Sequence, residues 1–429
     1  MNINQVNKIL REYEASGLES DLVIDGFSFW IKLKNDIFTF LTKDTISIGV
    51  ERKRFFNLFS IFFYFLNIFF LFRLFFLKKK IFISTALSGI SDNKDLFTNS
   101  LRSRYDSFFY FLNIGEVERI KSNKLFFKEN FVFSDNLFLW PLKFFAVKSA
   151  VYFLPKKQKN AIFNLINFFE ARGVEIPYKL VASSFITYAV GYYFYYYFFK
   201  LTKPIKCYIV SAYSKSDLCA ACIKSSIPVF EIQHGIVGAE HRGYNYYAKN
   251  FRSSVTIPTP QKIIVTNNFW KKELLGAGYF QEKQIIVGEN YKLARVNTEF
   301  SKQFQYFVFS GQGIDYDSIE RFYIKSEDYL SANNYRLLYK PHPREDIVII
   351  KKRFSKYPLL HIYEGIETAE TLIFKSIAHV SFYSSCHFDA VEMKGKTLIL
   401  RNKLSLLMNR YVDKYPNQFV VINSLGEKI

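Results

Sequence analysis

From about residue 204, strand-like and helix-like stretches alternate, and this alternation restricts the possible folds more than any other feature. Buried-strand patterns occur at 204–213, 227–235, 262–267 and 284–290, and helical patterns follow the first and the third of them. A second alternating set begins near residue 305. Strands that alternate with helices form parallel sheets covered on both faces. The sequence therefore predicts an α/β chain with two Rossmann-like domains that face each other across a cleft.

A polar stretch without a clear period separates the two sets. We predict an N-terminal Rossmann-like domain over residues 1–292, a linker over 293–303 and a C-terminal domain over 304–429. A chain of 429 residues can give each domain its own core. Ligands of such sheets bind at the carboxyl ends of the strands, so residues that follow a strand are the first functional candidates.

The net charge of +20 indicates an anionic partner, either a membrane surface, a phosphorylated small molecule or a nucleic acid. The basic residues are dispersed, and no nucleic-acid-binding signature is found, which argues against nucleic acid. Four cysteines and no secretory signal predict a reducing compartment. Cys219 and Cys222 form a C-x-x-C on a predicted helix, where we expect core packing rather than metal or redox chemistry.

Two long apolar runs raise the question of membrane contact. Residues 55–72 are 18 positions without a charge, with basic residues on both sides. This pattern favours a helix over 55–77 that lies in the membrane interface, while a buried core helix and a true span remain alternatives. Residues 181–199 are also uncharged but rich in tyrosine, and there we expect a core helix.

A rigid basic turn follows one strand of the second set. In "KPHPR", two prolines bracket His342, with Lys340 before it and Arg344 after it. Proline fixes its own backbone and extends the preceding residue, so Pro341 and Pro343 hold the imidazole stiffly at the strand end. The turn is either a phosphate-binding element or an ordinary basic surface turn.

Two hydroxyl groups open the next candidate segment, "YSSCHFD". Ser384 and Ser385 stand between a strand and a helix, where N–H groups and the helix dipole favour an anion. They can bind a phosphate or only cap the helix. Asp389, one turn further, either accepts a ribose hydroxyl or complements the dipole.

A glycine loop follows another strand of the second set. Gly311 and Gly313 allow the backbone to approach a diphosphate or an acceptor. The following "DYD" spells a metal-binding motif, but Asp315 begins a helix and is expected to be its N-cap. We therefore predict no metal site.

The first set ends one of its strands in "QHG". A histidine suits a general base, since an imidazole in general titrates near neutrality, and His234 is the candidate here, although a core histidine bonded to a carbonyl is the alternative. Gln233 and Gly235 flank it on the expected acceptor side. Glu240 and His241 either orient His234 or lie on a loop.

Taken in order, "QHG", "KPHP" and "YSSCHFDAVEMKGKTLIL" resemble the bacterial GT-B transferases of surface-polysaccharide assembly. This group includes capsule and O-antigen glycosyltransferases, CDP-glycerol glycerophosphotransferases and polysialyltransferases. The resemblance places the base at His234 and the donor phosphates at residues 342–343. It places the motif that closes the site at Ser384, Ser385 and Asp389.

The resemblance implies a metal-independent GT-B glycosyltransferase whose C-terminal domain binds a nucleotide-activated sugar and which uses no cofactor besides this co-substrate. It implies a glycan or polyprenyl-diphosphate-linked acceptor, and a cytoplasmic, peripheral location on the inner face of the plasma membrane. Gln233 stands where the teichoic-acid group has an aromatic residue, and "VSFYSS" lacks that group's usual Asp. Both departures favour sugar transfer. Polyol-phosphate transfer from a CDP-polyol and a non-catalytic sugar-nucleotide-binding subunit remain alternatives.

Overall fold

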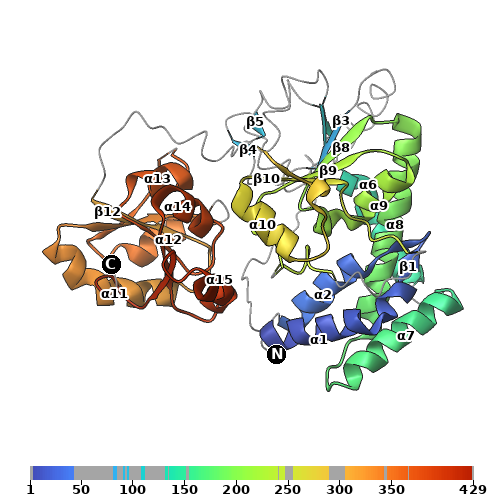
Figure 1. The fold of residues 1–429 in the computed structure, drawn as a ribbon, viewed down its shortest axis with the longest axis horizontal. Helices are drawn as coiled ribbons and strands as arrows, with labels where there is room; N and C mark the ends of the chain where they lie inside the picture. The colour runs from blue at the N-terminus through green and yellow to red at the C-terminus, as the bar shows by residue number, and fades with distance from the viewer. Residues whose placement is uncertain are drawn as a thin grey trace. The chain divides into compact units, whose positions relative to one another are not determined.

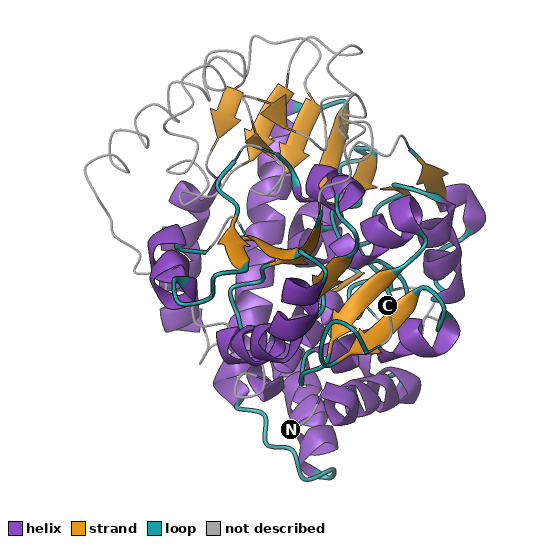
Figure 2. Ribbon diagram, turned by 90° about the vertical axis from the view of Figure 1, so that its left-hand side faces the viewer, coloured by secondary structure: helices purple, strands orange, loops and turns teal. Residues whose placement is uncertain are grey.

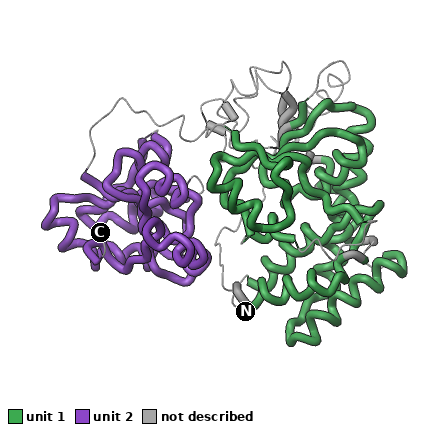
Figure 3. The backbone as a smooth tube through the Cα atoms, in the orientation of Figure 1, with its two compact units in different colours: residues 1–47, 52–289 green, residues 48–51, 290–429 purple. Residues whose placement is uncertain are grey.

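The structure, a computed structural model, describes residues 3–42, 81–84, 90–91, 94–95, 108–111, 131–133, 135–150, 154–239, 241–246, 255–288, 305–342, 345–365 and 367–427. The chain divides into two compact units (Figures 1 and 3). Unit 1 comprises residues 1–47 and 52–289, and unit 2 comprises 48–51 and 290–429. The predicted helix at 55–77 and the predicted linker at 293–303 lie outside the described residues, and the predicted domain limits stay predictions.

Unit 1 is built on a seven-stranded sheet in which all neighbouring strands are parallel. In spatial order its strands are β11 (Ile285–Val287), β10 (Lys262–Val265), β9 (Val229–Ile232), β8 (Lys206–Val210), β3 (Ile81–Ser84), β6 (Phe108–Phe111) and β7 (Phe131–Phe133). The chain starts at the centre with β3, moves outward to β7 and returns to β8 on the other side of β3. The sheet therefore has a topological switch point between β3 and β8, where doubly wound folds place their ligands.

The strands of unit 1 form because short apolar runs fit between two helical layers. In β8, four successive residues from Cys207 to Val210 are buried, as expected for a strand covered on both faces. The helices of unit 1 are α1 (Ile3–Ser16), α2 (Trp30–Thr42), α6 (Asp135–Ala150), α7 (Lys156–Glu170), α8 (Tyr178–Thr202), α9 (Ser216–Lys224) and α10 (Asn268–Gly276). Figure 2 distinguishes the helices of the chain from its strands by colour. Two short antiparallel pairs, β1 (Val23–Ile24) with β2 (Phe27–Ser28) and β4 (Ile90–Ser91) with β5 (Lys94–Asp95), complete the unit.

The tyrosine-rich run at 181–199 is the central helix of unit 1. Twelve residues of α8 are buried, and they face several directions around the helix, which confirms the predicted core helix. Gly191 allows α9 to pack closely, because an added Cβ would clash with the side chain of Asp217. On α9, Cys219 and Cys222 are fully buried, so the predicted core role of the C-x-x-C is also confirmed. Within the described part of the chain, no helix has both the length and the apolar character needed to cross a membrane.

Unit 2 is built on a six-stranded sheet, again parallel at every pair of neighbours. In spatial order its strands are β14 (Leu360–Ile362), β13 (Arg336–Lys340), β12 (Tyr306–Ser310), β15 (His379–Ser381), β16 (Thr397–Leu400) and β17 (Phe419–Ile422). Its helices are α11 (Tyr316–Ala332), α12 (Ile347–Phe354), α13 (Ala369–Lys375), α14 (Cys386–Lys394) and α15 (Asn409–Lys414). The switch point of this sheet lies between β12 and β15.

Alternate residues of β12 enter different cores of unit 2. Phe307 and Phe309 join the cluster that contains Ile319 and Phe322 of α11, whereas Val308 packs in the cluster with Leu372 of α13. Helices therefore cover both faces of the sheet. The prediction of an α/β chain with two Rossmann-like parallel sheets is confirmed. The GT-B arrangement of these two sheets stays a prediction. That the two domains face each other across a cleft stays a prediction.

Candidate functional site

His234 lies at the carboxyl edge of the unit 1 sheet, two residues after the end of β9. Its side chain is half-buried. The neighbouring strand, β8, borders the switch point and ends at Val210. The sequence prediction that this histidine follows a strand is confirmed, and the strand order adds that it lies one strand away from the switch point.

Gln233 fixes the backbone beside His234. Its buried side chain donates from Nε2 to the carbonyl of Gly235, at 2.8 Å. Its Oε1 accepts the backbone N–H of Thr266, at 2.9 Å, and Thr266 follows β10. Gln233 therefore ties together the ends of two adjacent strands and acts as a positioning residue for the turn.

Packing does not explain why residue 235 is a glycine. An added Cβ there would meet no atom of the described residues within 4 Å, and Gly235 is not among the glycines with positive φ. By contrast, Gly238 has a φ of 125° and faces Glu273 of α10 at 3.1 Å from an added Cβ. The fold therefore demands glycine at 238 but not at 235. A glycine needed only for the approach of a substrate would have these properties.

Ser211 is a contact of His234 that the sequence did not reveal. Its hydroxyl oxygen lies 2.9 Å from Nδ1 and 3.2 Å from Nε2 of the imidazole. Ser211 directly follows β8, so it stands at the switch point itself. The two residues are 23 positions apart in sequence and meet because β8 and β9 are adjacent and parallel.

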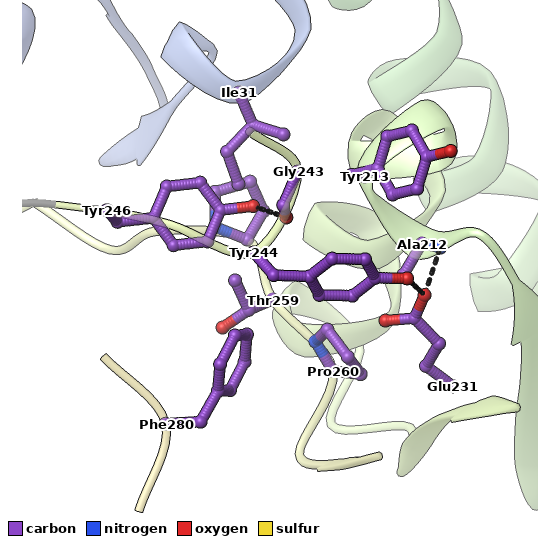
Figure 4. A pocket seen from close by; sticks show the side chains of 11 residues that line it. Ile31, Ala212, Tyr213, Glu231, Gly243, Tyr244, Tyr246, Thr259, Pro260 and Phe280 are labelled. Atoms are coloured by element: carbon purple, nitrogen blue, oxygen red, sulfur yellow. Dashed lines mark hydrogen bonds between the residues drawn. The ribbon is translucent and has the colours of Figure 1, made fainter. Parts of the chain in front are cut away.

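A buried carboxylate lies under this edge. Glu231 of β9 is 1% exposed, and its Oε1 accepts the backbone N–H of Ala212 at 3.1 Å and the hydroxyl of Tyr244 (Figure 4). Burial raises the pKa of Glu231 from 4.5 to about 7, although both hydrogen bonds oppose this rise. Glu231 therefore holds the residue after Ser211 and carries a carboxyl group that titrates near neutral pH.

The cavity beside Glu231 is small. Its volume of about 10 Å³ is roughly what one water molecule requires. It is lined mainly by aromatic residues and prolines, namely Ile31, Ala212, Tyr213, Glu231, Gly243, Tyr244, Tyr246, Pro258, Thr259, Pro260 and Phe280. A sugar does not fit into this space, so it is no substrate pocket.

His241 lies on the loop that covers this cavity. Its Nδ1 accepts the backbone N–H of Gly243 at 3.1 Å, and its ring packs against Tyr213 with centroids 4.8 Å apart. Burial, and then the nearby cation of Arg242, lower the pKa of His241 to about 3, so the ring is neutral. These contacts describe a residue that holds the loop. Glu240 lies outside the described residues, and the acceptor-side roles of both residues stay predictions.

In unit 2, Gln312 bridges the switch point. Its side-chain Nε2 donates to the carbonyl of Tyr383, and its Oε1 accepts the N–H of the same residue at 3.2 Å. Gln312 follows β12, and Tyr383 follows β15. The loops after the two strands on either side of the switch are therefore joined, which brings Gly311 and Ser384 to one edge. The sequence prediction did not include Gln312.

A carboxylate occupies the turn after β13. Glu345 accepts the backbone N–H of His342 with Oε2, and with Oε1 it accepts the hydroxyl groups of Tyr316 at 2.9 Å and Tyr339 at 2.6 Å. An added Cβ at Gly311 would clash with this carboxylate. Close packing against Glu345 therefore accounts for that glycine.

The remaining residues of the rigid turn are only partly described. Lys340 lies with its Nζ 4.6 Å from the ring centre of Tyr363, and burial lowers the pKa of its amine. Gly313 has a φ of 70°, which favours glycine. Pro343 and Arg344 lie outside the described residues. The phosphate-binding roles of Lys340, His342 and Gly313 stay predictions.

The two serines at the start of α14 differ. Ser384 Oγ accepts the backbone N–H of Cys386 at 3.2 Å and so acts as a helix cap. The Ser385 hydroxyl is half-buried and makes no hydrogen bond to any described residue, although Ser385 is the N-cap residue. Asp389 is buried, with 7% exposed. Ser385 is therefore the hydroxyl that remains available for a ligand, and the ligand roles of all three residues stay predictions.

A buried polar chain lies beneath the same edge, and the sequence prediction did not include it. His379 contacts Ser310 Oγ through Nε2 at 2.9 Å and Thr397 Oγ1 through Nδ1 at 3.0 Å. Nδ1 of His387 lies 2.7 Å from the same Thr397 oxygen. Burial lowers the pKa of both histidines, that of His387 to about 3, so both rings are neutral. The chain ties β12, β15, β16 and α14 together.

Asp315 is the N-cap of α11, as predicted. Its Oδ1 accepts the backbone N–H of Ser318 at 3.2 Å, and its Oδ2 accepts the side-chain N–H of Asn402 at 2.9 Å. Both carboxylate oxygens therefore have protein donors. Among the described residues, no cluster of metal-binding side chains occurs.

No protein-family model and no curated protein matches the sequence. Among solved structures, the chain is similar to UDP-GlcNAc 2-epimerase from Neisseria meningitidis bound to UDP-GlcNAc, with 10% identity, 79% of this chain and 92% of that chain covered and a TM-score of 0.43. It is similar to Acinetobacter baumannii MurG, with 9% identity, coverage of 80% and 86% and a TM-score of 0.43. The glycotransferase of kitacinnamycin gives 11% identity, coverage of 80% and 86% and a TM-score of 0.42.

Proposed function

We propose that the protein is a glycosyltransferase that moves a sugar from a nucleotide-activated donor to a hydroxyl group of a glycan. One observation carries this proposal. In each unit, candidate residues such as His234 and Ser384 lie on loops at the carboxyl edge of a parallel sheet, at or next to the switch point. These are the positions at which doubly wound sheets bind nucleotides and their phosphates.

The donor is proposed to bind to unit 2. Two groups can contact its phosphates: the ring of His342, and the Ser385 hydroxyl at the start of α14, which has no hydrogen bond to a described residue. Helix N–H groups and nearby cations stabilise the charge that develops on the leaving phosphate, so we propose a reaction without a metal ion. Lys340 is the described cation nearest to this turn in sequence.

The acceptor is proposed to react at unit 1, with His234 as general base. The acceptor oxygen forms a bond to the anomeric carbon, and the bond between this carbon and the phosphate oxygen breaks. The hydroxyl proton passes to an imidazole nitrogen of His234, and the electron pair of the broken bond stays on the leaving nucleotide. His234 is half-buried, so the residue is not fully enclosed by the described protein.

The biological setting is proposed from the sequence resemblance and the charge. We infer a lipid-linked glycan acceptor in capsule or O-antigen synthesis, at the inner face of the bacterial plasma membrane. The net charge of +20 supports attraction to an anionic membrane surface. Vesicle flotation with and without anionic lipid tests this part: binding that does not depend on anionic lipid contradicts it.

Donor binding is tested by thermal shift with UDP, GDP, CDP and CMP. A nucleotide that binds the folded state raises the melting temperature by mass action. We expect one nucleotide to stabilise the wild type and to lose most of this effect in His342→Ala. His361→Ala is the matched control, because His361 is an exposed histidine of β14 in the same unit. If the nucleotide raises the melting temperature equally in both variants, His342 does not bind the donor.

Turnover is tested with labelled donor sugars and with CDP-glycerol. We expect sugar transfer that falls at least about a hundredfold in His234→Ala, the lower end of what a general base contributes. Transfer from CDP-glycerol with release of CMP would instead identify a polyol-phosphate transferase. Nucleotide binding without transfer from any donor would identify a non-catalytic subunit.

A further inference from the structure

The C-terminal end of α8 exposes large apolar side chains where the outer face of a helix usually carries polar ones. Tyr197 is 58% exposed, and Leu201, one turn further along the helix, is 65% exposed. Ile205, just after the end of α8, is 40% exposed. A single exposed apolar residue is ordinary, but three large ones within nine positions indicate a contact surface.

The inner side of this helix end is anchored in the core of unit 1. Phe198 and Phe199 are buried, and their ring centroids lie 5.7 Å and 5.6 Å from that of Phe82 on β3. Thr202 is also buried and donates to the carbonyl of Phe198 at 2.8 Å. The exposed side chains are therefore carried by a fixed element, so binding through them costs little backbone freedom.

Lysines accompany the exposed apolar side chains. Lys200 and Lys203 are exposed, and the stretch 191–206 contains no Asp or Glu. Cations near the C-terminus of a helix complement its dipole, which is sufficient to explain the two lysines alone. It does not explain why the positions between and around them carry a tyrosine, a leucine and an isoleucine. The combination indicates a partner that is both apolar and negatively charged.

We propose that Tyr197, Lys200, Leu201, Lys203 and Ile205 form a docking surface for an anionic membrane. Tyrosine rings are favoured at the boundary between headgroups and acyl chains, and aliphatic side chains enter the outer part of the acyl layer. Lysine stems extend along apolar surface while their ammonium groups contact anionic headgroups. An anionic lipid surface therefore matches all three kinds of side chain at this helix end.

The docking surface and the candidate site lie at opposite edges of the unit 1 sheet. Ile205 directly precedes β8, whereas Ser211 and His234 follow the carboxyl ends of β8 and β9. The five residues of β8 correspond to roughly 17 Å. The two regions can therefore be varied separately. Only the use of this surface to reach a lipid-linked acceptor rests on the proposed function.

The first test removes the charges and measures partition of the full chain onto phosphatidylcholine vesicles with and without phosphatidylglycerol. Each lysine near an anionic surface contributes about fivefold to binding, so Lys200→Gln with Lys203→Gln should weaken partition about thirtyfold. Lys156→Gln with Lys157→Gln is the matched control, because it removes the same charge from exposed positions at the start of α7. We expect the control to bind nearly as well as wild type.

The second test removes the apolar contact while keeping the charges. Replacing the three apolar residues together by serine should weaken partition at least about tenfold (Tyr197→Ser, Leu201→Ser, Ile205→Ser). The matched control replaces three exposed aliphatic residues of unit 2, which are 59%, 70% and 61% exposed (Ile324→Ser, Val348→Ser, Ile349→Ser). Melting temperatures should stay close to that of wild type, since all these positions lie at the surface. If the serine substitutions lower the melting temperature, the lysine variants decide the test.

Several results would overturn the inference. If wild type does not bind vesicles, or if the α8 variants bind as well as wild type, this helix end does not contact the membrane. If only the unit 2 control loses binding, the membrane contact lies on α11 and α12. If the serine variant of α8 changes from dimer to monomer in size-exclusion chromatography while its partition is unchanged, the surface is an interface between two copies.

Transfer assays separate this inference from the proposed function. We expect the α8 variants to transfer sugar to a soluble acceptor at the wild-type rate, and to lose transfer to a lipid-linked acceptor in vesicles in proportion to their lost partition. If vesicle binding depends on the end of α8 but no donor supports transfer, the proposed function fails while the docking surface stands.

Discussion

Glu231→Gln is expected to stabilise unit 1 at high pH and to leave its stability nearly unchanged at low pH. Glu231 is 1% exposed, and burial raises its pKa from 4.5 to about 7. This rise corresponds to roughly 3 kcal/mol of additional cost for the ionised carboxylate in the folded state, as an upper limit. Glutamine retains an oxygen that can accept from Ala212 and Tyr244, so the substitution mainly removes the charge.

The sign follows from the two pKa values. Below about pH 4.5 the carboxyl group is protonated in the folded and the unfolded chain, and the wild type carries no penalty. Between 4.5 and 7 the folded state binds more protons than the unfolded state, so stability falls as pH rises. Above pH 7 the penalty is complete. We therefore expect the free energy of unfolding of Glu231→Gln to exceed that of wild type by up to roughly 3 kcal/mol at pH 8.5, and by little at pH 4.5.

Urea unfolding followed by tryptophan fluorescence measures this difference in the correct unit. All three tryptophans, Trp30, Trp140 and Trp270, belong to unit 1. Because the variant is compared with wild type at each pH, other titrating groups cancel. Glu175→Gln, at an exposed position before α8, is the matched control and should show no pH-dependent difference. A constant difference between pH 4.5 and 8.5 for Glu231→Gln would refute the reasoning.

Three further predictions concern other residues at these edges. Gly235→Ala should change the unfolding free energy by less than about 0.5 kcal/mol, because an added Cβ meets no described atom, but it should lower the rate of sugar transfer if a substrate approaches there. A large loss of stability would show that the glycine is needed for packing instead. Glu345→Ala removes the carboxylate that accepts from three donors, including the N–H of His342, and should lower the unfolding free energy by about 2–4 kcal/mol. Faster hydrogen exchange in β12 and β13 measures this loss, and unchanged exchange would contradict the prediction. The low pKa of His387, about 3, should make unit 2 lose stability as pH falls below about 6.5, because the unfolded state binds a proton that the folded state does not. Hydrogen exchange of unit 2 peptides should therefore be less sensitive to acid in His387→Gln than in wild type, and equal sensitivity would refute this.

The alternation of elements could be predicted because a strand between two helical layers is apolar along its whole length. The run "KCYIV" is an example: four of its five residues are buried in β8. The start of a helix could also be predicted where the side chain that caps it is close in sequence. Asp315 accepts the N–H of Ser318, three residues ahead, so the local sequence contains both partners.

The partners of the candidate residues could not be predicted, because they depend on which strands are neighbours. Gln312 meets Tyr383 across 71 positions only because β12 and β15 are adjacent, and Ser211 meets His234 only because β8 and β9 are. Strand order is a long-range property that local patterns do not contain. The left-handed conformation of Ser211 leaves no sequence signal either, since glycine or asparagine would be the usual marker.

The arrangement of charges in unit 2 indicates where a donor phosphate can lie. On one side of the switch point, Glu345 already places a carboxylate against the His342 N–H and Gly311. A phosphate bound to the His342 N–H or to the glycine loop would meet this negative charge and would compete for an occupied donor. The occupied donor is the backbone N–H, so the proposed role of the His342 imidazole is unchanged. On the other side, the Ser385 hydroxyl has no hydrogen bond within the described chain.

We therefore expect the phosphates of the proposed donor to contact the start of α14 rather than the glycine loop. Ser385→Ala should weaken nucleotide binding about tenfold to a hundredfold, the loss of one hydrogen bond to a charged group, without lowering thermal stability. Ser384→Ala is the informative comparison, because its hydroxyl caps the helix and its removal should lower stability by about 1 kcal/mol. Isothermal titration with the nucleotide identified by thermal shift measures both variants. Wild-type affinity in Ser385→Ala would place the phosphates elsewhere and would return the glycine loop to consideration.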